Sequence, residues 1–250
     1  MAMIPERIPP DPEFATTRYT ADTLVLPHLR RVLSELVCQA SGTFRGSVHG
    51  TERDKMSISS KGNANMPKRA LVLIDIQNDY FPGGKWTLSG IEPAADNAAR
   101  VLAAARATGD LVIHIRHEFT KPDAPFFAPG SEGAKIHSTV RAADGEPVVL
   151  KHHVNAFRET DLKAILDRHG IDEVVICGAM SHMCVDAGAR AASDLGYKCI
   201  VVHDACATRD QEFEGMVVPA AQVHAAFMAA LKFGYATSVS AKEYLAGKTK

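Results

Sequence analysis

Apolar residues form two kinds of pattern from about residue 70 onward. Short runs with almost no polar interruption are typical of strands in a sheet that is covered on both faces. Between these runs, apolar residues recur at intervals of three and four, which is the spacing of one helical face. The runs predict strands at residues 70–76, 111–115, 147–150, 173–177, 198–203 and 236–239, with the last strand at an edge.

Helices are predicted between the strands. Pro93 and Pro219 each open a helix, and Gly109 and Gly170 each end one, because proline favours the first helical turn and glycine the position just past the end. Another helix begins near Cys184, and a short one follows the last strand. The inward faces of the helices after Cys184 and after Pro219 are expected to carry Cys184, Gly188, Ala191 and Leu195, and Val223, Ala226, Phe227, Ala230 and Leu231, respectively.

The alternation of strands and helices predicts the α/β class. We expect a three-layer αβα sandwich, in which helices cover both faces of a six-stranded, mainly parallel sheet of Rossmann-like type. Residues 1–65 differ from this pattern, since prolines crowd the beginning and a polar linker leads up to Met66. They predict a poorly ordered N-terminal extension with one amphipathic helix at 26–37, followed by the main folded domain at 66–250.

The composition limits which binding partners and which cellular compartment we expect for this protein. The 250 residues have a formal net charge of −1, and 46% of them are hydrophobic, so there is no electrostatic case for nucleic acid or an anionic membrane. No apolar run approaches the ~20 residues of a membrane span. The first ten residues do not resemble a secretory signal, which favours a cytoplasmic protein. Five cysteines, an odd number, lie mostly in strand-like runs, so we expect reduced thiols.

Polar residues end several of the predicted strands. In a parallel sheet, ligands bind outside the carboxyl ends of the strands, so side chains at those ends have priority as site residues. Asp75 ends the first strand, Lys151 ends the third, and a glycine-led turn after the fourth leads to Cys184. An aspartate, a lysine and a cysteine that are far apart in sequence are therefore predicted to converge.

Cys184 is the candidate nucleophile because it stands where a helix begins. Unpaired N–H groups and the helix dipole at such an end favour thiolate over thiol, which predicts a lowered pKa. Asp75 is either a structural cap of the following turn or the general base that takes the thiol proton. Lys151 is either a strand-end lysine that reaches the solvent or a cation that lowers the pKa of the thiol.

A long irregular stretch, residues 118–134, is rich in proline, glycine and phenylalanine. Loops of this length in a compact domain are usually functional, although a surface excursion is the alternative. Four residues near the proposed strand ends are candidates for contacting a substrate, with packing as the alternative role for each. They are Gln77, Trp86, His117 and Phe157.

Four sequence motifs together resemble the isochorismatase-like cysteine hydrolases. They are residues 73–81 (LIDIQNDYF), Lys151 with the following Asn-Ala-Phe at 155–157, residues 178–185 (GAMSHMCV) and residues 204–208 (DACAT). The similarity runs from about Arg69 to Leu245, in order and with consistent spacing, and leaves the N-terminal extension uncovered.

This resemblance implies a catalytic triad of Asp75, Lys151 and Cys184. It also implies a cis peptide between Ala179 and Met180, which presents the amides of Met180 and Cys184 as an oxyanion hole. The implied reaction is attack of the thiolate on the carbonyl of a small amide, ureido or lactam compound, followed by hydrolysis of a thioester. The family also implies a homodimer or homotetramer and no cofactor.

Two departures narrow the activity. Nicotinamidases of this superfamily hold a metal through an Asp-x-His pair and a further histidine after the second strand. Here that stretch is Ile115-Arg116-His117, so the acidic ligand is absent and we expect no metal, although His117 and His137 are candidates for part of a site. Isochorismatases cleave a vinyl ether without a cysteine, so Cys184 favours C–N hydrolysis. Ether hydrolysis, and a non-catalytic binding or thiol-redox protein on the same fold, are the alternatives.

Overall fold

Six parallel strands form the central sheet, in the order β3-β2-β1-β4-β5-β8. The computed structural model describes residues 68–248, so the predicted extension at 1–65 and Cys38 lie outside the described residues, and the predicted domain boundary stays a prediction. The shortest strands of this sheet, β3 and β8, lie at its two edges. The strands are β1 (Arg69–Ile74), β2 (Leu111–His117), β3 (Val148–Lys151), β4 (Glu173–Ala179), β5 (Lys198–Ala207) and β8 (Thr237–Val239).

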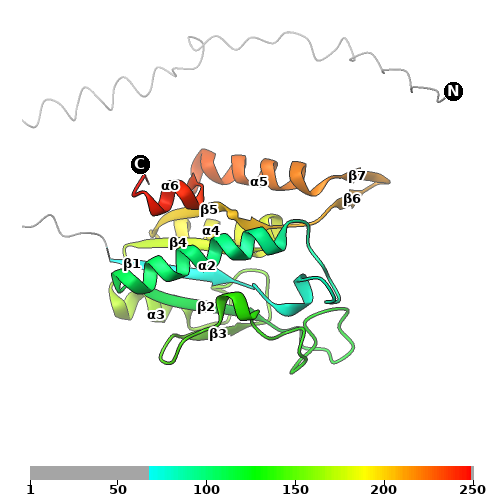
Figure 1. Cartoon of the computed structure of the whole chain (residues 1–250), viewed down its shortest axis with the longest axis horizontal. Helices are drawn as coiled ribbons and strands as arrows, with labels where there is room; N and C mark the ends of the chain where they lie inside the picture. Colours follow the sequence, from blue (N-terminus) through cyan, green and yellow to red (C-terminus); the bar gives the residue numbers. More distant parts are fainter. Residues whose placement is uncertain (1–67, 249–250) are drawn as a thin grey trace, which may run out of the picture. The chain divides into compact units, whose positions relative to one another are not determined.

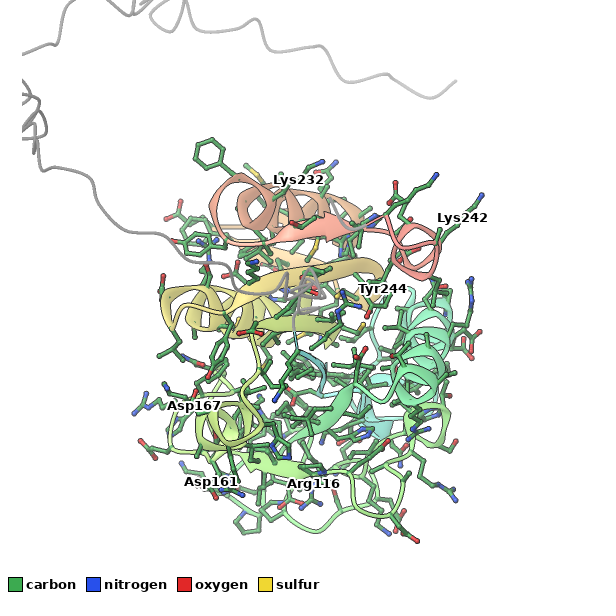
Figure 2. All side chains as sticks on the ribbon, turned by 90° about the vertical axis from the view of Figure 1, so that its left-hand side faces the viewer. Arg116, Asp161, Asp167, Lys232, Lys242 and Tyr244 are labelled. Atoms are coloured by element: carbon green, nitrogen blue, oxygen red, sulfur yellow. The ribbon has the colours of Figure 1, made fainter. Side chains whose placement is uncertain are left out.

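Helices cover both faces of this sheet (Figure 1). Alternate residues of β1 point to opposite faces, as the pleat requires, so that Leu71 packs with one set of helices and Val72 with the other. Figure 2 shows Lys242 of α6 on the side of α2, and Asp167 of α3 on the opposite side. One face is covered by α2 (Ile91–Thr108) and α6 (Ala241–Leu245), and the other by α3 (Leu162–His169), α4 (Asp186–Asp194) and α5 (Ala220–Gly234).

The predicted α/β class and three-layer, six-stranded architecture are confirmed. All five strand pairs of the sheet are parallel, and β8 lies at an edge as expected. Helix α2 ends at Gly109, as predicted, but it begins at Ile91, two residues before Pro93. None of the helices between residues 68 and 248 has both the length and the apolar character to span a bilayer.

The predicted inward face of α4 is wrong in part. A turn of π-helix, η4 (Ser181–Val185), precedes α4, and its wider winding rotates the helix relative to a regular 3.6-residue count. The buried residues of α4 are therefore Gly188, Ala189 and Ala192, whereas the side chain of Leu195 is 42% exposed.

The predicted face of α5 also differs from the structure. Val223 and Leu231 are buried as expected, but Ala226 and Ala230 are exposed. This helix is rich in alanine on every side, and small methyl groups do not mark one face strongly enough for the spacing to identify it.

A short antiparallel hairpin after β5 was not predicted. It consists of β6 (Gln211–Phe213) and β7 (Met216–Val218), and the two residues between the strands, Glu214 and Gly215, both have positive φ angles. Such two-residue turns suit glycine at the second position, so the Glu-Gly pair was the available signal. Its strands are too short for a periodic pattern to reveal them.

Candidate active site

Asp75 follows directly after β1. Its amide N–H donates to the carbonyl of Ile115 on β2, and its backbone turns into the left-handed region with φ of 51°. A residue other than glycine pays about 1–2 kcal/mol for this conformation, which is kept where the surroundings enforce it. The turn places the carboxylate at the carboxyl end of the sheet, with no exposure to solvent.

Lys151 is the last residue of β3 and reaches across the end of the sheet. Its ammonium nitrogen lies 2.7 Å from a carboxylate oxygen of Asp75 and 3.2 Å from the sulfur of Cys184. The lysine side chain is fully buried, so it does not reach the solvent. Sulfur, carboxylate and ammonium therefore meet within hydrogen-bond reach, which the proposed proton transfer requires.

Cys184 lies in the π-helical turn that follows β4. Gly178 brings this segment against β1, since its φ is +133° and a Cβ atom there would lie 2.0 Å from the carbonyl oxygen of Ile74. The peptide bond between Ala179 and Met180 is cis, as the resemblance implies. The Met180 carbonyl then accepts hydrogen bonds from the amides of Met183 and Val185, which folds the turn around Cys184.

Burial determines the protonation of the site. Desolvation raises the pKa of Asp75, and the charge of Lys151 only partly offsets it. Desolvation and the charge of Asp75 raise the pKa of the Cys184 thiol, although Lys151 favours the thiolate. The prediction of a lowered thiol pKa is therefore wrong for the unliganded site, because the loss of water outweighs both the helix end and the lysine. Cys184 rests as a neutral thiol.

The ammonium group of Lys151 keeps its charge. Burial acts to lower its pKa, but the charge of Asp75 and the hydrogen bonds to Asp75 and Cys184 oppose burial, and the pKa of Lys151 is raised. The charged ammonium therefore stands between the carboxyl group of Asp75 and the thiol of Cys184. The carboxylate is placed to accept the thiol proton when a substrate arrives.

The possible metal ligands gather around the same lysine. Ligand atoms of Asp75, His117 and Cys184 lie within 4.8 Å of one another. The Lys151 ammonium lies 2.7 Å, 2.8 Å and 3.2 Å from the three groups, respectively, and so takes the position that a metal ion would need. His137 belongs to another environment, where its ring stacks on Phe81 and its Nδ1 atom faces the hydroxyl of Thr139. These residues do not fit a metal centre.

The four candidate substrate contacts occupy different places. Gln77 is fully buried, and its amide nitrogen donates to the carbonyls of His117 and Ala134, so both of its N–H groups serve the fold. His117 is 6% exposed and contacts Lys151. Phe157 packs against the apolar cluster that also contains Cys184, and its ring stacks on Tyr197. Of the four, only Trp86 lines the cavity described next.

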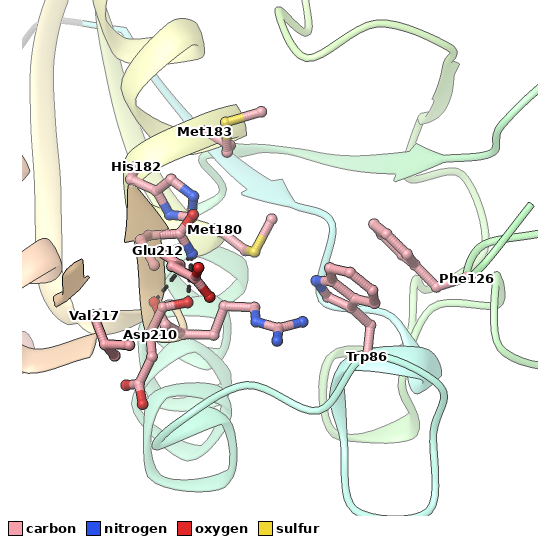
Figure 3. A pocket seen from close by; sticks show the side chains of 10 residues that line it. Trp86, Phe126, Met180, His182, Met183, Asp210, Glu212 and Val217 are labelled. Atoms are coloured by element: carbon pink, nitrogen blue, oxygen red, sulfur yellow. Dashed lines mark hydrogen bonds between the residues drawn. The ribbon is translucent and has the colours of Figure 1, made fainter. Parts of the chain in front are cut away.

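A cavity of ≈ 540 Å³ opens onto the turn that carries Cys184 (Figure 3). Met180 and Met183, which both precede the cysteine in the same turn, form part of its wall. Trp86 and Phe126 stack with ring centroids 4.7 Å apart, and together they form an aromatic surface facing these methionines. The remaining lining residues are His182, Arg209, Asp210, Gln211, Glu212 and Val217, so the unpredicted hairpin supplies another wall.

Arg209 is one of the lining residues of this cavity that sequence reasoning missed. Its guanidinium lies 4.2 Å from the centroid of the Trp86 ring, a cation–π contact. Within residues 68–248 it takes part in no ion pair, so its N–H groups are available to an anion. The sequence signal that could have identified Arg209 is its position directly after the 204–208 motif.

The long loop at 118–134 is held firmly against the segment after β1. Asp79 accepts a hydrogen bond from the amide of Phe127, and its own amide donates to the carbonyl of Gly133. The side chain of Asn78 donates to the carbonyl of Glu132. The loop that carries Phe126 is therefore tied to the segment after the strand end that carries Asp75, and its functional role stays a prediction.

Comparison with known proteins gives one consistent result. The family model described as the isochorismatase domain matches residues 69–239. The uncharacterized isochorismatase family protein YddQ of Bacillus subtilis is 49% identical over 176 residues, which are 70% of this chain and 98% of YddQ. Maleamate amidohydrolase of Pseudomonas putida is 31% identical over 159 residues, 58% of this chain and 75% of that enzyme. A crystal structure from Oleispira antarctica, described as a candidate isochorismatase hydrolase, has 59% identity, covers 74% of this chain and 100% of its own, and superposes with a TM-score of 0.71.

Proposed function

The chain belongs to the isochorismatase family, and we propose that within this family it is a cysteine hydrolase that cleaves a C–N bond of a small amide, ureido or lactam compound. The observation that carries the proposal is the position of the Lys151 ammonium, 2.7 Å from Asp75 and 3.2 Å from the Cys184 sulfur. A base, a cation and a nucleophile in this contact suit acyl transfer. The relationship to maleamate amidohydrolase supports C–N hydrolysis over ether hydrolysis.

In the proposed mechanism, Asp75 takes the thiol proton as the sulfur of Cys184 attacks the substrate carbonyl. The amides of Met180 and Cys184 stabilise the oxyanion of the tetrahedral intermediate. Collapse breaks the C–N bond, and Asp75 returns the proton to the leaving nitrogen. Asp75 then takes a proton from water, which attacks the thioester; the acid leaves, and the proton restores the thiol. The balance is one amide and one water converted to one acid and one amine.

Lys151 has a different task in this scheme. Its charge compensates the carboxylate before the transfer and the thiolate afterwards, so the negative charge always has a buried partner. Because the ammonium contacts both groups, no large movement is needed when the proton changes place.

The lining of the cavity indicates the size and charge of the substrate. Its volume of ≈ 540 Å³ suits a small molecule, and its aromatic and methionine walls suit an apolar body. Arg209 supplies a cation without an ion-pair partner in the described residues, and a guanidinium binds a carboxylate through two parallel hydrogen bonds. We therefore infer that the substrate carries an anionic group in addition to the bond that is cleaved.

The test is a panel of small amides, ureido compounds and lactams, with release of ammonia or amine as the readout. The wild-type protein should turn over at least one carboxylated member, and Cys184→Ala should reduce this rate at least a thousandfold. Intact-protein mass spectrometry should show a transient adduct on the wild type that Cys184→Ala lacks. Activity that survives Cys184→Ala, or turnover confined to vinyl ethers, would contradict the proposal.

A further inference from the structure

The Lys151 ammonium has more acceptors than the triad supplies. Besides Asp75 and Cys184, it lies 2.8 Å from the Nδ1 atom of His117 and 3.1 Å from the carbonyl oxygen of His153. An ammonium has three N–H groups, so these four acceptors compete for three donors. The two shortest contacts, to Asp75 and to His117, fix the direction of the remaining N–H toward the sulfur and the carbonyl.

The His117 ring can serve as an acceptor because it is neutral. Burial, followed by the charge of Lys151, lowers the pKa of His117 to about 3. Since the ammonium can only donate, Nδ1 must be the unprotonated nitrogen, and the hydrogen resides on Nε2. The Nε2 atom is buried and has no hydrogen-bond partner among residues 68–248. The ring therefore makes its polar contact with Lys151.

The backbone of His117 is held in place by a second buried side chain. The Gln77 amide donates to the carbonyl of His117 at 2.8 Å, and its oxygen accepts from the His117 N–H at 2.8 Å. The same amide donates to the carbonyl of Ala134 at the end of the 118–134 loop. The ring also contacts Phe119, with centroids 4.8 Å apart. His117 is thus fixed on both its backbone and its ring.

We propose that His117 is a positioning residue of the hydrolase, which holds the Lys151 ammonium against Cys184 through a neutral acceptor. The inference rests on the proposed role of Cys184 as the nucleophile. Neutrality is essential to the task. A carboxylate at this position would draw the ammonium from the sulfur and add a negative charge beside a thiol that must ionise. An imidazole directs the ammonium and leaves the charge balance unchanged.

The experiment measures the rate of Cys184 alkylation by iodoacetamide against pH, with mass spectrometry to identify the modified cysteine. His117→Ala should slow the reaction at pH 8 by about threefold to tenfold and move the profile to higher pH, because the thiolate loses part of its cation. His117→Asn should restore most of the rate, since asparagine places its side-chain oxygen close to the position of Nδ1. His117→Gln places its amide nearer Nε2 and should behave like His117→Ala.

Alkylation needs no substrate, so the test of His117 is independent of the amide panel that tests the proposed hydrolase activity. Circular dichroism and thermal unfolding verify that each variant is folded, and His169→Ala, a change of an exposed histidine at the end of α3, is the matched control with an unchanged profile. The inference is overturned if folded His117→Ala keeps the wild-type profile, or if His117→Asn and His117→Gln are equally impaired. Every variant in this experiment keeps the other groups that face the thiol, which are Asp75, Lys151 and Tyr80.

Discussion

The ammonium nitrogen of Lys151 lies 2.7 Å from a carboxylate oxygen of Asp75, and both side chains are completely buried. A pair in this setting contributes little net stability over an apolar pair, but the loss of one partner leaves an uncompensated charge in a water-free site. The consequences of this contact differ for stability and for activity, and they can be measured separately.

Lys151→Met should lower the free energy of unfolding by about 3–5 kcal/mol, because Asp75 is left without its cation. Asp75→Asn combined with Lys151→Met should be more stable than Lys151→Met alone, since no charge then remains to be buried. Both variants should be inactive. Urea denaturation checks this order, with Lys163→Met, which removes only an exposed ion pair on α3, as a control that changes by less than about 1 kcal/mol.

Asp75→Asn should accelerate alkylation of Cys184 while it abolishes hydrolysis. The charge of Asp75 is one of the causes that raise the pKa of the thiol, and Lys151 remains in the variant to stabilise the thiolate. At pH 8 the variant should therefore react faster with iodoacetamide than the wild type, by about tenfold. A slower reaction in the variant would show that the carboxylate promotes the thiolate rather than opposing it.

Arg209→Gln should raise KM for carboxylated substrates by about tenfold to a hundredfold and leave kcat nearly unchanged, because the guanidinium binds a group remote from the reacting bond. A monoamide of a dicarboxylic acid and its uncharged diamide form the matched substrate pair. Only the charged member should respond. Arg100→Gln, at an exposed position on α2, controls for the loss of an arginine. An equal effect on both substrates would contradict the anion-binding role.

Glu146 should stabilise the fold at neutral pH and lose this effect in acid. Arg106 donates to both of its carboxylate oxygens, and these bonds lower the pKa of Glu146 to about 2 from an ordinary 4.5. A depressed folded-state pKa gives stability that is fully present above pH 4.5 and is lost as the pH falls toward 2. Glu146→Gln should therefore cost about 2 kcal/mol near pH 7 and much less at pH 2.5.

The measurement is urea unfolding at both pH values. The exposed Glu132→Gln is the control and should change stability by less than about 0.5 kcal/mol. A penalty for Glu146→Gln that is the same at both pH values would assign the effect to packing rather than to charge.

Gly178→Ala should prevent stable folding, because the added Cβ would lie 2.0 Å from the backbone carbonyl of Ile74 and that oxygen belongs to a central strand. Gly234→Ala is the matched control, since no atom lies within 4 Å of the added Cβ and its φ is unremarkable; it should be neutral or stabilise by up to about 1 kcal/mol. Soluble yield and thermal unfolding distinguish the two variants. A Gly178→Ala protein with near-wild-type stability would contradict the close approach of β4 to β1.

Properties that depend on neighbouring residues in the chain can be predicted from this sequence. Properties that depend on contacts between distant residues cannot. The apolar runs identify β1, β2 and β4 because a strand with both faces covered needs an unbroken hydrophobic segment. The same local reasoning fails for α4, because one π-helical turn changes which of its residues face the core. It also fails for the hairpin, whose strands have three residues each.

By itself, the sequence determined the parallel sheet and the strand ends that bring Asp75, Lys151 and the turn of Cys184 to one edge, since hydrophobic period and chain order are local properties. Only the tertiary structure decided that the thiol is neutral, that a neutral His117 directs the lysine, and that Arg209 faces the cavity. These properties arise from loss of water and from contacts between residues far apart in the chain. Burial opposes the charged thiolate, and Cys184 at this helix end is only 5% exposed.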